Sequence, residues 1–278
     1  VTSRLEWPSD AEIWGLALQG QNTYNTVIKL KDNLGFSQAV VWTQDAGSAD
    51  NFRNYVRNLT IDTGVGNPGA SGLEFMSNNN GAVFDVIIKS GGGGDVGLDF
   101  SYNGLNGPLL AKHVKIIGFN IGVKASGGVN SQTMEHIILE GQATYGIRND
   151  GQVFNVRKVY SDNSCPAVYH TGGVLTLLDS ELVGGSGGND AVVVTGGRAF
   201  IRNVSSSGYN WTVNSTTGHG GDVTGTYVGE FTTHDVLTLW PQQEQSLNLP
   251  IVETPYPDWE QDFNKWANVM DYGAAGDK

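Results

Sequence analysis

Length, composition and charge bound the class of protein. The chain has 278 residues, a formal net charge of −12 at pH 7, 39 glycines and 16% charged residues. Its low charge density and its aromatic residues indicate a folded chain, and the acidic balance argues against nucleic acid or anionic membranes as partners. Cys165 is the single cysteine, which excludes an internal disulfide framework. No apolar run approaches the roughly 18 residues of a membrane-spanning helix.

The first 55 residues contain three short stretches that resemble strands: WGLALQG, NTVIKLKD and AVVWTQ. Alternation of apolar and polar residues is typical of β-strands with one buried face. We therefore expect this part of the chain to form the first coils of a larger β-structure.

Six short segments recur farther along the chain: GLEF (72–75), GLDF (97–100), IGVKA (121–125), YGIRN (145–149), AVYH (167–170) and AVVV (191–194). Aligned on the first inward apolar residue, they give one column: Leu73, Leu98, Val123, Ile147, Val168 and Val192. Successive members lie 25, 25, 24, 21 and 24 residues apart. A coil of parallel strands keeps one phase in this way, because each rung stacks on the last and extends the same core. The spacing predicts an all-β fold, a right-handed single-stranded parallel β-helix with stacked strands from about residue 10 to 213.

A second series of strands precedes the first, and its members begin at Asn58, Asp85, His113, His136 and Asn155. Asn, Asp and His tolerate left-handed or bridge backbone conformations better than most residues, so we expect them at a sharp corner of the coil. His113 and His136 are accordingly interpreted as turn residues and not as a metal pair. We predict no metal site and no cofactor.

Beyond about residue 214 the repeat fades into a polar stretch and then an extended linker, marked by Pro241, Pro250, Pro255 and Pro257. A short helix is expected to start at Asp258, whose carboxylate can cap it, with Gln261 three residues later. One apolar stripe would pack this helix down: Trp259, Phe263 and Trp266. We expect the segment 240–278 to pack poorly on its own.

The final residues carry a family resemblance. Asp271-Tyr272-Gly273-Ala274, followed by Gly276-Asp277, resembles the opening of the pectate lyase superfamily β-helix domain, where a YGA-x-GD-G-x-x-DD-T signature begins the first coil. The start of the chain, SRLEWPSDAEIWGLALQGQNTYNTVIKLKD, resembles later coils of that family, and residues 54–90 are the most specific match. The tandem members place two β-helices side by side, and glycoside hydrolase family 55, the exo-β-1,3-glucanases, is the best understood of them.

The resemblance implies a division into three parts. Residues 1–239 would form a β-helix domain without its first coil, residues 240–267 an interdomain linker with a short helix, and residues 268–278 the first strand of a second β-helix. In family 55 the general acid is a glutamate of the second helix, so the resemblance implies that this chain alone is inactive. Met76 and Asn79 stand where that family is expected to carry glutamines near the attacking water, which favours a looser relative.

Candidate site residues follow from the alternation of a strand, because the residue after each inward position points outward. That outward column is Glu74, Asp99, Lys124, Arg148 and Tyr169. Rungs about 4.8 Å apart would make Glu74 and Asp99 adjacent carboxylates, near the roughly 5–5.5 Å of retaining glycosidases. We predict these two as catalytic residues and the other three as substrate-binding, with Tyr169 stacking on a sugar ring. The alternative is a solvated ladder in which Asp99 meets Lys124.

Three classes of function follow. The first is part of a secreted polysaccharide-degrading enzyme, a glycoside hydrolase acting on a β-glucan-like polymer with a second β-helix or a companion chain as partner. The second is a polysaccharide lyase on a uronate polymer, which the 16 scattered basic residues disfavour. The third is a non-catalytic carbohydrate-binding or tailspike-like structural module, since fold does not fix function.

Overall fold

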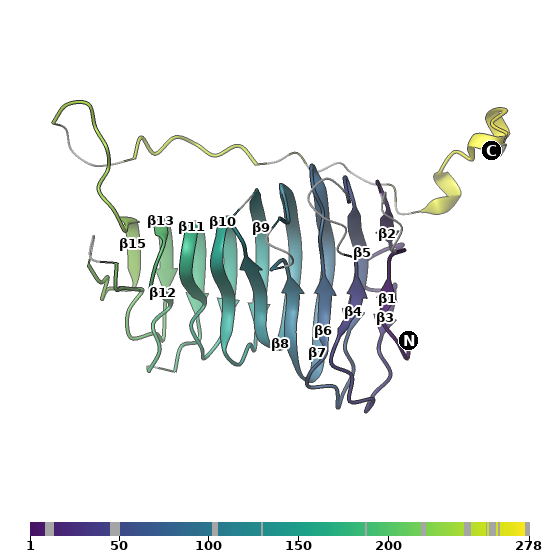
Figure 1. Cartoon of the computed structure of the whole chain (residues 1–278), viewed down its shortest axis with the longest axis horizontal. Helices are drawn as coiled ribbons and strands as arrows, with labels where there is room; N and C mark the ends of the chain where they lie inside the picture. Colours follow the sequence, from purple (N-terminus) through teal and green to yellow (C-terminus); the bar gives the residue numbers. More distant parts are fainter. Residues whose placement is uncertain are drawn as a thin grey trace.

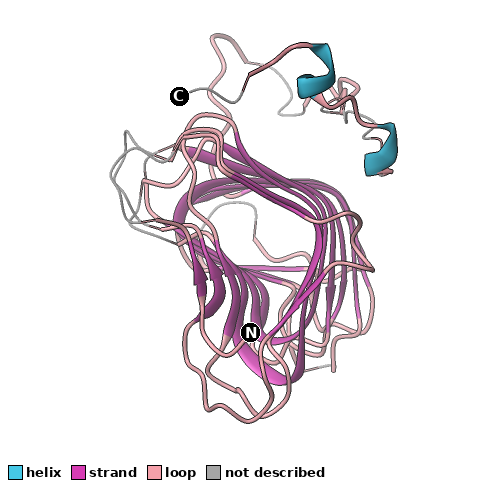
Figure 2. Cartoon of the chain, turned by 90° about the vertical axis from the view of Figure 1, so that its right-hand side faces the viewer, coloured by secondary structure: helices cyan, strands magenta, loops and turns pink. Residues whose placement is uncertain are grey.

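The protein is a parallel β-helix, in which strands stand side by side along the long axis of the molecule (Figure 1) and surround one interior (Figure 2). The computed structural model describes residues 1–8, 14–44, 51–101, 105–128, 130–186, 188–217, 221–241, 246–253, 255, 260 and 262–275. All strand pairings along the coil are parallel apart from those of the last strand and one isolated bridge within these residues. The predicted β-helix is confirmed.

The strands follow one another with almost no helix between them. The first seven are β1 (Leu5–Glu6), β2 (Ala17–Gln19), β3 (Val27–Lys29), β4 (Ala39–Trp42), β5 (Tyr55–Asp62), β6 (Ser71–Glu74) and β7 (Gly81–Asp99). The next eight are β8 (Leu109–Ser126), β9 (Ser131–Glu140), β10 (Tyr145–Asp162), β11 (Val168–Val183), β12 (Val192–Val194), β13 (Arg198–Ser206), β14 (Val213–Ser215) and β15 (Tyr227–Thr232). Two 3-10 turns close the chain, η1 (Phe263–Lys265) and η2 (Val269–Tyr272).

Each complete coil contributes to three faces. In the coil that starts at β6, the first face is 71–74, the second face is 81–84 and the third face is 86–89. The long strands β7, β8, β10 and β11 bend around a corner and so belong to more than one face. The stretches 17–19, 27–29 and 39–42 are strands of the first coils, as expected.

The predicted inward column of the first face is confirmed without a break. The register pairs Leu73 with Leu98, Leu98 with Val123 and Val123 with Ile147. The column goes on through Val168 and Val192. All six side chains are fully buried, so burial of one apolar position in every coil builds the core.

The corner between the second and third faces is a column of left-handed residues. Asn58, Asp85, His113 and His136 have φ between 52° and 55°, as the residue types predicted. Asn155 does not belong to this column: it pairs with Thr133 and Thr176 within the second face. The left-handed residue of that coil is Lys158, with φ 53°. A lysine has no preference for this conformation, and the repeat imposes it because the coil must bend at the same place.

The last coils are closed by a strand of opposite direction. β15 pairs antiparallel with β13, which places Phe231 beside Ile201 and Val228 beside Val204. Phe231 and Val228 are buried. β15 therefore covers the free edge of β13, which would otherwise present unpaired backbone groups.

Beyond β15 the chain leaves the coil and returns along the body toward the first strands (Figure 1). The expected helix start at Asp258, with Gln261 and Trp259, lies outside the described residues. Asp262 caps η1 instead, and its side chain accepts a hydrogen bond from the Asn264 backbone nitrogen. Phe263 and Trp266 pack on each other and stay 49% and 44% exposed, so these two rings of the expected stripe do not pack down on the coil. The poor packing expected of the whole segment 240–278 stays a prediction.

Residues 269–272 form the turn η2, not the strand expected for 268–278. Asn268 caps this turn and Gly273 ends it with a left-handed backbone, so the local capping groups favour a turn here. The division of the chain into 1–239, 240–267 and 268–278 stays a prediction. Among the described residues, no helix is long and apolar enough to cross a membrane.

Candidate functional site

The outward side of the first face carries one column of polar and aromatic side chains. Its pairings run Glu74–Asp99, Asp99–Lys124, Lys124–Arg148 and Arg148–Tyr169. Because the preceding residue of each pair is buried in the core, the strand alternation turns these side chains outward. The five predicted residues thus lie on consecutive rungs, and their roles stay a prediction.

Glu74 is a half-buried carboxyl in this column. Its burial raises the pKa of the carboxyl, and the nearby Asp99 raises it further. Arg4 and Lys124 act in the opposite direction, with smaller effects. A half-buried carboxyl with a raised pKa beside a second carboxyl is the arrangement that a general acid requires.

The register places Asp99 beside Lys124, as the ladder alternative expected, but among the described residues no ion pair joins the two side chains. Its carboxylate accepts a hydrogen bond of 2.7 Å from the Ser101 backbone nitrogen and a second from the Ser101 hydroxyl. Within the described part of the chain, the Lys124 ammonium forms no ion pair. Arg148, the other cation of this column, pairs with Asp150, and Asp99 is held by its own turn.

The column extends toward the N-terminus through residues that the repeat did not predict. Trp42 pairs with Glu74 on β4, and Glu6 pairs with Trp42 on β1. The Arg4 guanidinium lies 4.0 Å from the centroid of the Trp42 ring and 2.6 Å from the Glu6 carboxylate. The first coils are longer than the later ones, so a spacing of about two dozen residues could not find these side chains.

The aromatic end of the column is a pair of rings. Tyr145 stacks on Tyr169 with centroids 4.5 Å apart and an angle of 23° between the rings. The Arg148 guanidinium lies 5.8 Å from the centroid of the Tyr145 ring and donates a hydrogen bond of 2.6 Å to Asp150. Tyr145 was missed because it lies two residues before the inward position, on the same strand motif YGIRN. One face of the predicted Tyr169 platform is covered by Tyr145.

An open hollow of about 490 Å³ adjoins this ring pair. Tyr145, Tyr169, Ser164, Ser186 and Asn189 line it. The Asn189 side-chain amide donates a hydrogen bond of 2.7 Å to the Ser164 carbonyl, which fixes the amide in the wall. Aromatic rings with hydroxyl and amide groups around them match the two surfaces of a neutral sugar, its apolar ring face and its hydroxyls.

The two positions singled out by the family resemblance differ in placement. Met76 is buried, so its side chain cannot face a ligand. Asn79 has a left-handed backbone and lines a second hollow of about 410 Å³ with Trp14 and Arg53. Trp14 is 59% exposed and contacts Phe52, with ring centroids 5.6 Å apart. This hollow offers an exposed indole face beside polar groups.

His113 and His136 lie in the corner between the second and third faces, away from the outward column. Their ring centroids are 5.0 Å apart, and His113 lies 3.3 Å from the Asp85 carboxylate. Among the described residues, no group of three or more His, Cys, Asp or Glu side chains could hold a metal ion. The two histidines are turn residues, as their residue types predicted.

Comparison with known families and curated proteins adds no assignment to this geometry. No protein-family model matches the chain. No curated protein matches it either.

Proposed function

We propose that this β-helix binds a polysaccharide along the outward column of the first face, as part of a secreted glycoside hydrolase acting on a β-glucan-like polymer. The observation that carries the proposal is the column itself: an acid pair at Glu74 and Asp99 in register with Tyr169, whose ring stacks on that of Tyr145. A long polymer fits an extended row of groups that repeats rung after rung.

Each group has a role in this proposal. Glu74, with its raised pKa, holds the proton that a leaving sugar oxygen needs, and Asp99 orients the attacking water or stabilises positive charge. Lys124 and Arg148 hydrogen-bond sugar hydroxyls. The Tyr145–Tyr169 pair binds a sugar ring at the hollow. A second β-helix, in the same or a companion chain, supplies the remaining side of the cleft.

Two other functions stay open, a lyase on a uronate polymer and a non-catalytic carbohydrate-binding or tailspike-like module. A lyase must neutralise the carboxylates of its substrate, and the column offers Lys124 as a cation without an ion pair among the described residues. The acid pair in the same column repels a uronate, so the neutral glucan is favoured.

Calorimetric titration with oligosaccharides tests the proposal. We expect a neutral β-glucan oligosaccharide to bind, and Tyr169→Ala to weaken this binding about 2- to 10-fold, because a stacked aromatic ring contributes roughly 0.5–1.5 kcal/mol. Glu74→Gln and Asp99→Asn should keep binding and, with a second β-helix present, abolish hydrolysis.

Tyr160→Ala is the matched control, because Tyr160 is an exposed tyrosine on the third face, away from the outward column. Its substitution should leave affinity unchanged. Binding of an oligogalacturonate in place of the neutral oligosaccharide would transfer the proposal to the lyase class. Equal affinity in the wild type and in a Glu74→Ala/Asp99→Ala/Tyr169→Ala variant would reject the column as the contact surface.

A further inference from the structure

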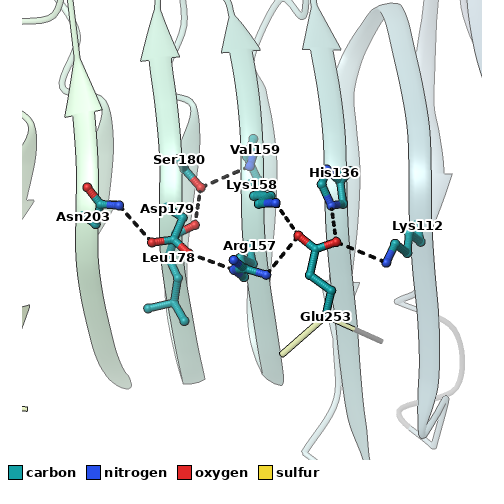
Figure 3. Close-up of polar contacts among 10 residues, drawn as sticks. All are labelled: Lys112, His136, Arg157, Lys158, Val159, Leu178, Asp179, Ser180, Asn203 and Glu253. Carbon is teal, nitrogen blue, oxygen red and sulfur yellow. Dashed lines mark hydrogen bonds and ion pairs between the residues drawn. The ribbon is translucent and has the colours of Figure 1, made fainter. Parts of the chain in front are cut away.

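The corner between the second and third faces borders a hollow of about 520 Å³, lined in part by His136 and Lys158, and this corner is called the groove below. Two outward columns border it, and the register identifies the members of the first: Lys112, Glu135, Arg157, Leu178 and Arg202. The second is the left-handed column, in which His136, Lys158 and Asp179 occupy consecutive coils. In Figure 3, four of these side chains project from neighbouring strands toward one carboxylate, that of Glu253: Lys112, His136, Arg157 and Lys158.

Glu253 belongs to the returning C-terminal segment and contacts four cationic or titratable side chains of the coil. One of its oxygens lies 3.0 Å from the His136 Nε2 and 3.6 Å from the Lys112 ammonium. The other lies 3.3 Å from Arg157 Nη1 and pairs with the Lys158 ammonium. Three strands, β8, β9 and β10, therefore converge on one side chain.

The charges around Glu253 show that the coil needs this carboxylate. Lys112 pairs with Glu135 at 3.2 Å, and the Arg157 Nε pairs with Asp179 at 2.8 Å. Within the described residues, Lys158 has Glu253 as its single carboxylate partner. Lys112 is 3% exposed and Arg157 is 16% exposed at their side chains. Removing Glu253 takes a carboxylate away from Lys112 and Arg157, whose side chains are largely buried, and leaves Lys158 without a carboxylate partner among the described residues.

The electrostatics of Glu253 agree with the geometry. Hydrogen bonds from Lys158 and His136 lower the pKa of its carboxyl from 4.5 to about 2. The carboxylate is therefore charged at any pH above about 4.

A second contact fixes the direction of the segment. The Ser246 backbone nitrogen donates a hydrogen bond of 2.8 Å to Glu230 on β15, and the Arg202 guanidinium on β13 lies 3.4 Å from the Ser246 hydroxyl. The segment 246–253 thus starts at the last coils and ends three coils back at β9, over roughly 14 Å at about 4.8 Å per rung. An extended segment of this length reaches that far with slack.

Apolar packing does not hold the segment in the groove. Leu247, Leu249 and Val252 are 83%, 65% and 90% exposed. Among the described residues, segment 246–253 is attached to the coil by the polar contacts of Ser246 and Glu253.

We propose that this corner groove is a docking site for an extended acidic peptide, that its occupant is the chain's own segment 246–253, and that Glu253 is the specificity-determining contact. Docking requires both the carboxylate of Glu253 and the length of the side chain that carries it. A glutamine at position 253 keeps the shape of the side chain and loses its charge. Aspartate keeps the charge on a side chain one methylene shorter, so it cannot reach both Lys112 and Lys158.

Spin labelling at Val252→Cys tests the proposal in the full chain. Cys165 is buried and burial raises the pKa of its thiol to about 11, so a thiol-directed nitroxide reacts at the introduced cysteine. We expect slow label motion in the parent chain and several-fold faster motion after Glu253→Gln, Glu253→Asp or Lys158→Gln. Raising salt to about 1 M, where the Debye length is about 3 Å, should speed the label in the parent and not in Glu253→Gln.

Two matched controls separate the groove from general charge effects. Glu260→Gln removes a carboxylate of the same C-terminal segment, whose ion pair is with Lys265, 3.0 Å away in that segment. Lys115→Gln removes a lysine of β8 that pairs with Glu140 on the third face. Both substitutions should leave the motion of the spin label slow. Equal motion in the parent and in Glu253→Gln would overturn the proposal, and label motion that slows with protein concentration would assign the groove to the segment of a second copy instead.

Discussion

His170 is a titratable side chain held without charge in the interior. It is fully buried at the corner between the first and second faces, and its Nδ1 lies 3.1 Å from the side-chain amide of Asn149. Asn149 also donates a hydrogen bond to the Gln152 carbonyl, so the imidazole contacts an amide that is itself held by a buried neighbour. Burial lowers the pKa of His170 from 6.5 to about 4, because the interior disfavours the charged imidazolium.

This burial predicts a loss of stability in mild acid. The unfolded chain binds a proton at His170 with a pKa near 6.5, whereas the folded chain binds it only near 4. Between these values the unfolded state holds more protons, so the free energy of unfolding falls as pH falls from about 6.5 to 4. We expect about 3 kcal/mol to be lost across this window, measured by urea unfolding at several pH values.

His170→Gln removes the titration and keeps an amide near Asn149. The difference in unfolding free energy between this variant and the parent should then change with pH by the same amount. A pH-independent difference would show that His170 does not titrate in this window.

The candidate site shows how far single residues could be predicted. The strand alternation placed all five residues of the outward column, because a period of two needs no knowledge of packing. It could not predict that Tyr145 stacks on Tyr169 or that Asp99 turns to Ser101, because these contacts depend on side-chain directions within the turns. The place of Lys158 in the corner column was not predicted for a related reason: its left-handed backbone is imposed by the coil and not by its residue type.

At the scale of the strand, the small residue before each inward position is required by contact with the next coil. Gly72, Gly97, Gly122 and Gly146 occupy that place in successive coils. A Cβ on Gly97 would lie 2.3 Å from the Ile116 Cγ2 and 2.8 Å from the Gly122 carbonyl oxygen. Neither neighbour can move freely, since one is a buried core side chain and the other is backbone.

Gly97→Ala should therefore destabilise the coil by about 2–3 kcal/mol, as overpacking does. Gly128→Ala is the matched control, because a Cβ there meets nothing within 4 Å. Denaturation midpoints in urea measure both. Equal midpoints for the two variants would mean that adjacent coils can separate at this corner without cost.

The same strands explain why the fold was predictable and its ends were not. Leu73 through Val192 repeat because every coil must bury one apolar residue at the same place. Outside the repeat no such constraint acts, and the sequence alone predicted a strand at 268–278 where residues 269–272 form a capped turn. The route of segment 246–253 could not be predicted either, because it depends on side chains that come from three different coils.

At the scale of the whole molecule, a β-helix is stabilised by contacts between neighbouring coils, and each open end is a place where it can lose structure or pair with another chain. β15 covers the C-terminal end by pairing antiparallel with β13. Its attachment depends on the inward side chains Phe231 and Val228, which are 6% and 2% exposed.

Phe231→Asp places a carboxylate at the buried position of this strand and should detach it from β13. We expect the uncovered β13 edge to pair with other copies, so that light scattering shows association that grows with concentration. Hydrogen exchange should rise first in β13 and β11 and leave β5 and β7 protected, because each coil contacts only its neighbours.

Tyr227→Asp is the control: Tyr227 lies on the same strand with its side chain 57% exposed, so the added carboxylate stays in solvent and the strand stays paired. A monomeric Phe231→Asp protein with protected β13 amides would show that β15 is not what closes this end of the coil.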